Sequence, residues 1–171
     1  MALMAYMYAV GQKSGQIKGG VSQKGREDSV QVIGYSHEIV SPRDPHSGLP
    51  TGQRMHKPLV ITKQLDKSTP LFYQVLCTNE NLSSVTIKFW SAQIKSTSGV
   101  TTSVQHYTVK LTNASIAQIQ AMSADDSHTE TAKAGEKSGE DIEKISFTYN
   151  SIEWTWTDGG ISANDSWESH V

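Results

Sequence analysis

The sequence predicts a mainly β protein with one short helix, packed as a barrel or a sandwich. Apolar and polar residues alternate with a period of two in several segments, for example in Val85–Trp90. Only one stretch combines a helix start with helical apolar spacing. The 171 residues include 36% apolar side chains, below the ~45–50% typical of a globular domain. This chain length predicts a single domain, and its large side chains on both strand faces suit a wall that also meets a partner.

The first half of the chain contains three expected strands and one long loop. Residues 2–10 are apolar, 28–40 are rich in β-branched residues, and 58–65 form a short apolar run. Between the last two, residues 41–57 hold three prolines and two glycines, which are too many breakers for regular structure. Loops of this length in compact domains are usually functional or disordered.

The single helix is expected near residues 66–77. Asp66 or Ser68 can accept hydrogen bonds from the first free amides. Pro70 falls in the first turn, where its missing N–H costs nothing. Leu71 and Val75 contribute to one apolar face, and Cys77 is interpreted as a small apolar residue on the buried side of the helix.

The second half predicts strands at 83–95, 100–112, 115–122 and 143–157. The last one changes parity, because Ile145 and Tyr149 alternate on one face whereas Ile152 and Trp154 fall on the other. Such a change indicates a bulge, a bend or burial on both faces. Residues 123–140 are expected to be a mobile acidic loop. Residues 158–171 read as a tail with few anchors beyond Ile161 and Trp167.

Charge excludes some classes of function. The net charge is −2, with nine basic and six acidic residues in 1–85 and six basic and eleven acidic residues in 86–171. This balance argues against nucleic-acid binding, whereas opposite charges in the two halves suit copies that meet head to tail. No apolar run approaches the ~20 residues of a membrane helix. No basic residue precedes the apolar start, so we expect a buried strand there instead of a cleavable signal peptide.

No chemistry-bearing motif appears. The histidines at positions 37, 46, 56, 106, 128 and 170 show no HExxH or paired spacing, and one cysteine forms no internal disulfide framework. We therefore expect no catalytic residue, no metal and no cofactor. Two other classes remain open as alternatives, namely a monomeric β-barrel module that binds a ligand and a secreted effector with its own activity.

Residues 43–71 carry a resemblance to a known family. They read RDPHSGLPTGQRMHKPLVITKQLDKSTPL, and the likeness continues through CTNE at 77–80 and the strand ISFTYNSIEWTW at 145–156. This sequence resembles Hcp, the haemolysin-coregulated protein family of bacterial type VI secretion, over most of the chain. Departures are confined to 123–140 and the last dozen residues, where no role is assigned.

The resemblance implies one domain over 1–171, a small barrel of two packed sheets with one short helix and a long extended loop. It also implies hexameric rings that stack into a tube, driven out of the cell by a contractile sheath behind a VgrG-type spike. Small effector proteins ride in the lumen, and the protein passes from the cytoplasm to the outside or into a target cell. The loop 41–57 is expected to serve assembly, and Lys88 is expected to face the lumen. The subunit and ring-stacking interface is expected to include Arg43, Asp44, Leu49, Pro50, Thr51, Arg54, His56 and Lys57.

Overall fold

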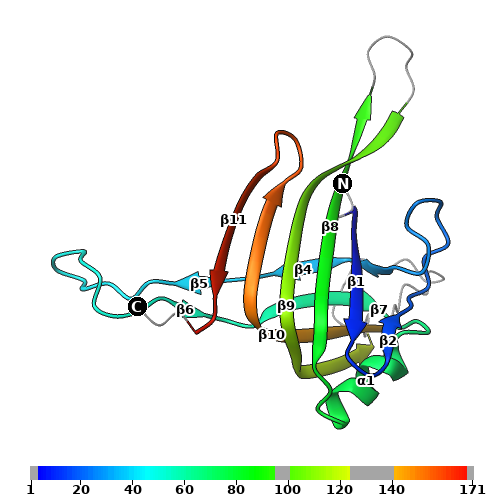
Figure 1. Cartoon of the computed structure of the whole chain (residues 1–171), viewed down its shortest axis with the longest axis horizontal. Coiled ribbons are helices and arrows are strands. Elements are labelled where there is room, and N and C mark those ends of the chain that lie inside the picture. Colours follow the sequence, from blue (N-terminus) through cyan, green and yellow to red (C-terminus); the bar gives the residue numbers. More distant parts are fainter. Residues whose placement is uncertain (1–3, 95–100, 124–140, 169–171) are drawn as a thin grey trace, which may run out of the picture.

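The computed structural model describes residues 4–94, 101–123 and 141–168, and it confirms a mainly β fold with one short helix (Figure 1). In chain order the elements are β1 (Met4–Gly11), β2 (Gly15–Ile17), β3 (Val30–Val32), β4 (Gly34–Ser36), β5 (Ile39–Val40), β6 (Met55–His56), β7 (Leu59–Gln64), α1 (Thr69–Cys77), β8 (Leu82–Ile94), β9 (Thr101–Ser123), β10 (Asp141–Trp156) and β11 (Ile161–Ser166).

Two sheets organise these strands. The large sheet runs β2-β1-β8-β9-β10-β7-β4, with β3 also paired to β1 and β11 also paired to β10. The small sheet consists of β5 and β6. Only Ile33 separates β3, at one end of the large sheet, from β4, at the other, and its amide donates to the Thr62 carbonyl at 2.8 Å. The 30–36 segment thus brings both ends together, without a continuous ladder around the barrel.

The three longest strands bend along one line, and this bend lets the large sheet wrap around a core. Asn113 in β9 has φ 50, a left-handed conformation that asparagine tolerates better than most residues. β9 pairs with β8 and β10 on both sides of Asn113 but not at Asn113 itself. The buried face switches parity there, from Leu111 to Ala114 in β9 and from Tyr149 to Ile152 in β10. The sequence predicted two strands where the structure has one bent β9.

The barrel interior is filled by apolar side chains. The largest fully buried ones are Met7, Ile17, Leu59, Ile61, Phe72, Leu82, Ile87, Leu111, Ile145, Phe147 and Ile152. They come from strands on all sides of the barrel and from α1, whose buried residues are Phe72 and Val75. A period-two pattern in the strands and a three-residue spacing in the helix therefore meet in one core.

The ends of α1 differ from expectation. Ser68 occupies the N-cap position, but its side chain accepts no capping hydrogen bond. Instead, the Asp66 carboxylate accepts the Ser68 amide at 2.9 Å and also its hydroxyl. Cys77 is exposed, so the interpretation as a buried apolar residue was wrong.

Residues 41–57, which we call the arm, carry more structure than expected. β5 and β6 pair at its base through Ile39 with His56 and Val40 with Met55, and Arg43 bridges to Pro50 further out. The expected mobile loop lies outside the described residues beyond Ser123. The tail contains β11, which had not been predicted, and Trp167 packs on the core whereas Ile161 is exposed.

Candidate assembly surface

The arm is a narrow ribbon that projects from one side of the barrel (Figure 1). Its tip is a turn around Asp44, whose Oδ1 accepts the amides of His46 at 2.6 Å and Ser47 at 3.1 Å. These two backbone hydrogen bonds lower the pKa of Asp44. Gly48 has φ +70 and donates its amide to the Asp44 carbonyl, so the turn needs a residue that adopts this conformation.

Large apolar side chains on the arm face solvent. Leu49 at the tip is 65% exposed and Met55 near the base is 52% exposed. Both belong to a segment that touches little of its own barrel. Exposed apolar side chains on a structured projection are typical of surfaces that another protein covers.

A chain of hydrogen bonds anchors the arm at its base. His37, just before β5, and His56, in β6, both bond to the Tyr149 hydroxyl, at 2.7 and 2.8 Å. His56 Nε2 bonds to Asp165 of β11 at 2.8 Å. Arg54 donates from Nε and Nη2 to the same carboxylate. The five side chains come from the arm, the residue before β5, β10 and β11, so the arm is fixed to the C-terminal part of the sheet.

The partners fix the direction of each proton in this chain. A carboxylate only accepts, so His56 donates from Nε2 to Asp165. In that tautomer His56 Nδ1 accepts from the Tyr149 hydroxyl, whose oxygen in turn accepts from His37 Nε2. Trp167 stacks edge-on against Tyr149, with ring centroids 5.0 Å apart, and closes the cluster.

Electrostatics in the arm base follow from burial and from Arg54. The hydrogen bond from Arg54 is the main reason that the pKa of Asp165 falls from 3.8 to about 2. Burial raises the pKa of the Tyr149 phenol above its usual value. Burial and the nearby His56 both lower the pKa of His37. The cluster is therefore built around one fixed negative charge with its guanidinium partner.

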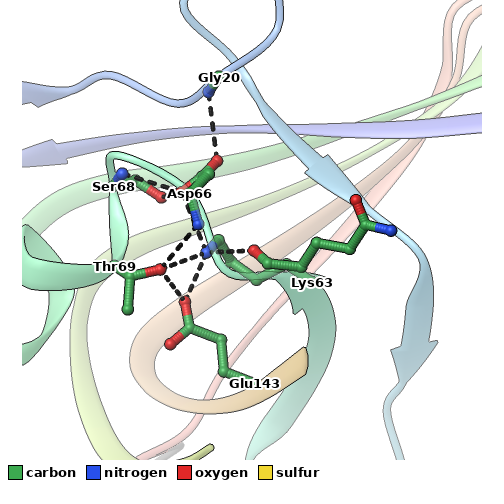
Figure 2. A network of polar contacts seen from close by, with 7 residues as sticks. Gly20, Lys63, Asp66, Ser68, Thr69 and Glu143 are labelled. Atoms are coloured by element: carbon green, nitrogen blue, oxygen red, sulfur yellow. Dashed lines mark hydrogen bonds and ion pairs between the residues drawn. The ribbon is translucent and has the colours of Figure 1, made fainter. Parts of the chain in front are cut away.

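A second charged network holds α1 against the barrel (Figure 2). Lys63 in β7 and Glu143 in β10 are both fully buried and form an ion pair. Lys63 Nζ also contacts the Thr69 hydroxyl and the Asp66 carboxylate, each at 3.1 Å. Burial alone would raise the pKa of Asp66, but the hydrogen bonds from Ser68 and the charge of Lys63 outweigh burial and lower this pKa. Buried charges require this degree of pairing.

The structure places the expected interface residues in two groups. Arg43, Leu49, Pro50, Thr51, Arg54 and Lys57 are exposed along the arm, and Asp44 is half-buried in its tip turn. His56 differs because its side chain is fully buried in the arm base, where it positions the arm. Lys88 lies on the outer face of β8, 5.0 Å above the Tyr8 ring.

Sequence reasoning missed most of the arm base. Tyr149 read as an ordinary core residue, and Asp165 lay in a tail with no assigned role. Arg54 and Asp165 are 111 residues apart, so no local pattern reveals their contact. Trp167, the one aromatic residue after β11, was the available hint that this tail packs on the sheet.

Comparison with known proteins supplies the family. The family described as "Type VI secretion system effector, Hcp" matches residues 6–156, which is most of the chain. The chain belongs to the Hcp family. A curated relative, "Major exported protein" of Pseudomonas aeruginosa, is 39% identical over 180 residues and covers 100% of this chain and 99% of its own.

Solved Hcp structures share the fold. A double mutant of Hcp1 from E. coli EAEC 042 is 27% identical with a TM-score of 0.80, covering 98% of this chain and 100% of its own. The secreted protein Hcp3 from Pseudomonas aeruginosa is 31% identical with a TM-score of 0.74 and the same coverage. In the part of the Hcp chain that the structure describes, no helix is long and apolar enough to cross a membrane.

Proposed function

We propose that this chain is the tube subunit of a type VI secretion system. Copies form hexameric rings, and the rings stack into a tube that a sheath and a VgrG-type spike carry outward. Small effector proteins travel in the lumen and the subunit itself has no catalytic role. The subunit is made in the cytoplasm and leaves with the tube.

The observation that carries this proposal is the pair of unsatisfied surfaces on one side of the sheet. β11 pairs only with β10 within the described residues, and Ile161 on it is 69% exposed. An exposed edge strand is a template for pairing with another chain, and proteins normally cover it. The arm leaves from the same side of the barrel (Figure 1), and its Leu49 and Met55 are exposed. A neighbouring copy would cover both.

The anchored arm base supports the same function. An arm that is already fixed in one orientation loses little entropy on docking, which favours assembly. The filled barrel interior argues against the alternative of a β-barrel that encloses a ligand, since Phe72 and Phe147 are fully buried inside it. The separate effector alternative would require a catalytic site of its own, for which the sequence offers no motif.

Sedimentation and negative-stain imaging of the purified chain test the proposal. We expect a particle of about six subunits that appears as a ring. Deleting residues 44–54 should leave a folded barrel by circular dichroism but weaken ring formation or stacking. A chain that stays monomeric over a wide concentration range would contradict the proposal.

A further inference from the structure

Arg26 is a buried cation that has no counter-ion among the residues that the structure describes. The side chain lies in the loop before β3 and only 4% of the residue is exposed. Its guanidinium lies 4.0 Å from the Trp90 ring centroid and 4.8 Å from that of Tyr6. Nη1 donates to the Tyr6 hydroxyl at 3.2 Å and to Gln23 Oε1 at 3.0 Å. All these partners are neutral, whereas buried charges in proteins are normally paired with an opposite charge.

The carboxylates nearest to Arg26 in sequence have other partners. Asp28 pairs with Lys18 at 3.2 Å and with Lys67 at 3.6 Å. Glu27 accepts the amide of Gly25 at 2.9 Å. Arg26 therefore forms no ion pair with any of the described residues.

A second polar atom beside Arg26 also has no partner. The indole Nε1 of Trp90 is buried and has no hydrogen-bond acceptor. A guanidinium and an indole N–H side by side are both donors, so the cluster has an excess of donors over acceptors. A single carboxylate with two acceptor oxygens would satisfy this chemistry.

The loop that holds Arg26 is rigid enough to form a site. Gly19 donates to the Asp28 carbonyl at 2.9 Å, and Asp28 donates to the Val21 carbonyl at 2.9 Å. A Cβ on Gly19 would lie 2.3 Å from the Ser29 carbonyl oxygen, so this close approach requires glycine. Arg26 is thus held in place before any partner arrives.

The position of Trp90 indicates where a carboxylate would come from. Beyond Trp90, residues 91–94 of β8 pair only with β9 among the described strands, so within the described residues this end of β8 has an open side. The other open side is that of β11, across the same sheet. Trp90 pairs with Gln105, and the next residue, His106, accepts the amide of Thr157 at 3.0 Å. The β10–β11 turn therefore lies level with Trp90 across the sheet.

We propose that Arg26 and Trp90 form a receptor for a carboxylate of the neighbouring copy, supplied by Asp158 in its β10–β11 turn. This inference rests on the proposed ring, in which one edge of each copy meets the opposite edge of the next. Copies in a ring are related by a rotation about the ring axis without a shift along it, so parts of two neighbouring copies that meet lie at the same height along that axis. Asp158 is exposed and makes no ion pair within the described residues, so it is free to make this contact.

The test compares ring assembly of four single variants by sedimentation over a range of concentrations. R26Q and D158N should each raise the concentration at which half of the rings dissociate by at least ~10-fold, because each leaves a desolvated charge unpaired. The matched controls K24Q and E153Q remove exposed charges from the same loop and the same hairpin, and should change this concentration less than ~3-fold. The R26Q/D158N double variant should be no worse than the weaker-assembling single variant.

Several outcomes would overturn the inference while leaving the ring intact. One is that R26Q or D158N assembles like the wild type. Because Asp158 is exposed, D158N should fold normally even if R26Q does not. Another is a double variant in which the two losses add. A third is a higher thermal midpoint in acetate than in chloride at equal ionic strength, measured on dilute subunits and found in the wild type but not in R26Q. The ligand of Arg26 would then be a free anion. Failure of the wild type to form rings would instead remove the proposed function and this inference with it.

Discussion

The chain contains two charged networks that differ in what surrounds them. The Lys63–Glu143 pair is fully buried beneath α1, and every partner belongs to the barrel or its helix. The arm base, from Arg54 through Asp165 and His56 to Tyr149, lies at the barrel's edge, and the Asp165 side chain is still 23% exposed. Burial decides what each network controls. The first is part of the folded core, whereas the second fixes a projection that the core does not need.

The largest effect expected from this comparison is on the buried pair. Replacing Lys63 with Met leaves Glu143 charged and buried, which should lower the free energy of unfolding by about 3–5 kcal/mol. Urea denaturation at a fixed assembly state measures it. Lys67→Met is the control, since Lys67 is exposed and its pair with Asp28 is long, so it should cost below about 1 kcal/mol. Equal losses in both variants would show that burial is not the deciding factor.

The next effect concerns the hydroxyl on which the arm base converges. Tyr149→Phe removes the partner of both His37 and His56, and a buried polar group without a partner costs about 1–3 kcal/mol. In Tyr149→Phe, amide hydrogen exchange should become faster than in the wild type in β5 and β6, and should change less in β7. Tyr8→Phe is the matched control, because the Tyr8 hydroxyl makes no hydrogen bond among the described residues. Protection of β5 and β6 that stays unchanged in Tyr149→Phe would place the anchor elsewhere.

Low pH should weaken the arm base, because the arm base depends on the negative charge of Asp165. The folded-state pKa of Asp165 is about 2 against an ordinary 3.8, so its contribution is complete above about pH 4 and is lost as the pH falls toward 2. Wild type and Asp165→Asn should therefore differ in arm protection at pH 7 and converge by about pH 2. A difference that persists unchanged at low pH would mean that the carboxylate charge is not what holds the arm.

The smallest effect on the protomer is expected at the arm tip. Leu49→Ser should leave the free energy of unfolding within about 0.5 kcal/mol, because Leu49 is exposed and touches no core residue. The same change should weaken ring assembly or stacking in sedimentation. Gln53→Ser, also exposed on the arm, serves as the control and should affect neither measurement. A clear loss of folding stability in Leu49→Ser would contradict this prediction, because it would show that the arm tip contributes to the stability of the core.

The sequence predicted the elements better than their long-range contacts. Period-two alternation predicted most of β8 and β10, apolar runs predicted most of β1 and β7, and the proline in the first turn predicted α1. The sequence analysis divided β9 into two strands, whereas the strand bends at Asn113 and continues. It missed β11, whose residues show no apolar alternation, and it misplaced Cys77.

The two networks show the same limit of sequence reasoning. Lys63 and Glu143 are 80 residues apart, and Arg54 and Asp165 are 111 residues apart. A local pattern tells which face of a strand is buried, but not which charge will lie across from it. The arm was predicted because its prolines and glycines lie close together in the sequence. Its anchor was missed because the anchoring residues lie far apart in the sequence.

The long separation between the arm and its anchor also bears on the order of synthesis. The arm leaves the ribosome long before Asp165, which lies 111 residues after Arg54. Until that aspartate emerges, His56 and Arg54 lack the carboxylate that orients them, and β10 has no β11 beside it. A nascent chain on a crowded polysome thus has neither a positioned arm nor a finished edge. In the proposed ring assembly, a subunit therefore becomes competent to join its neighbours only after β11 is made.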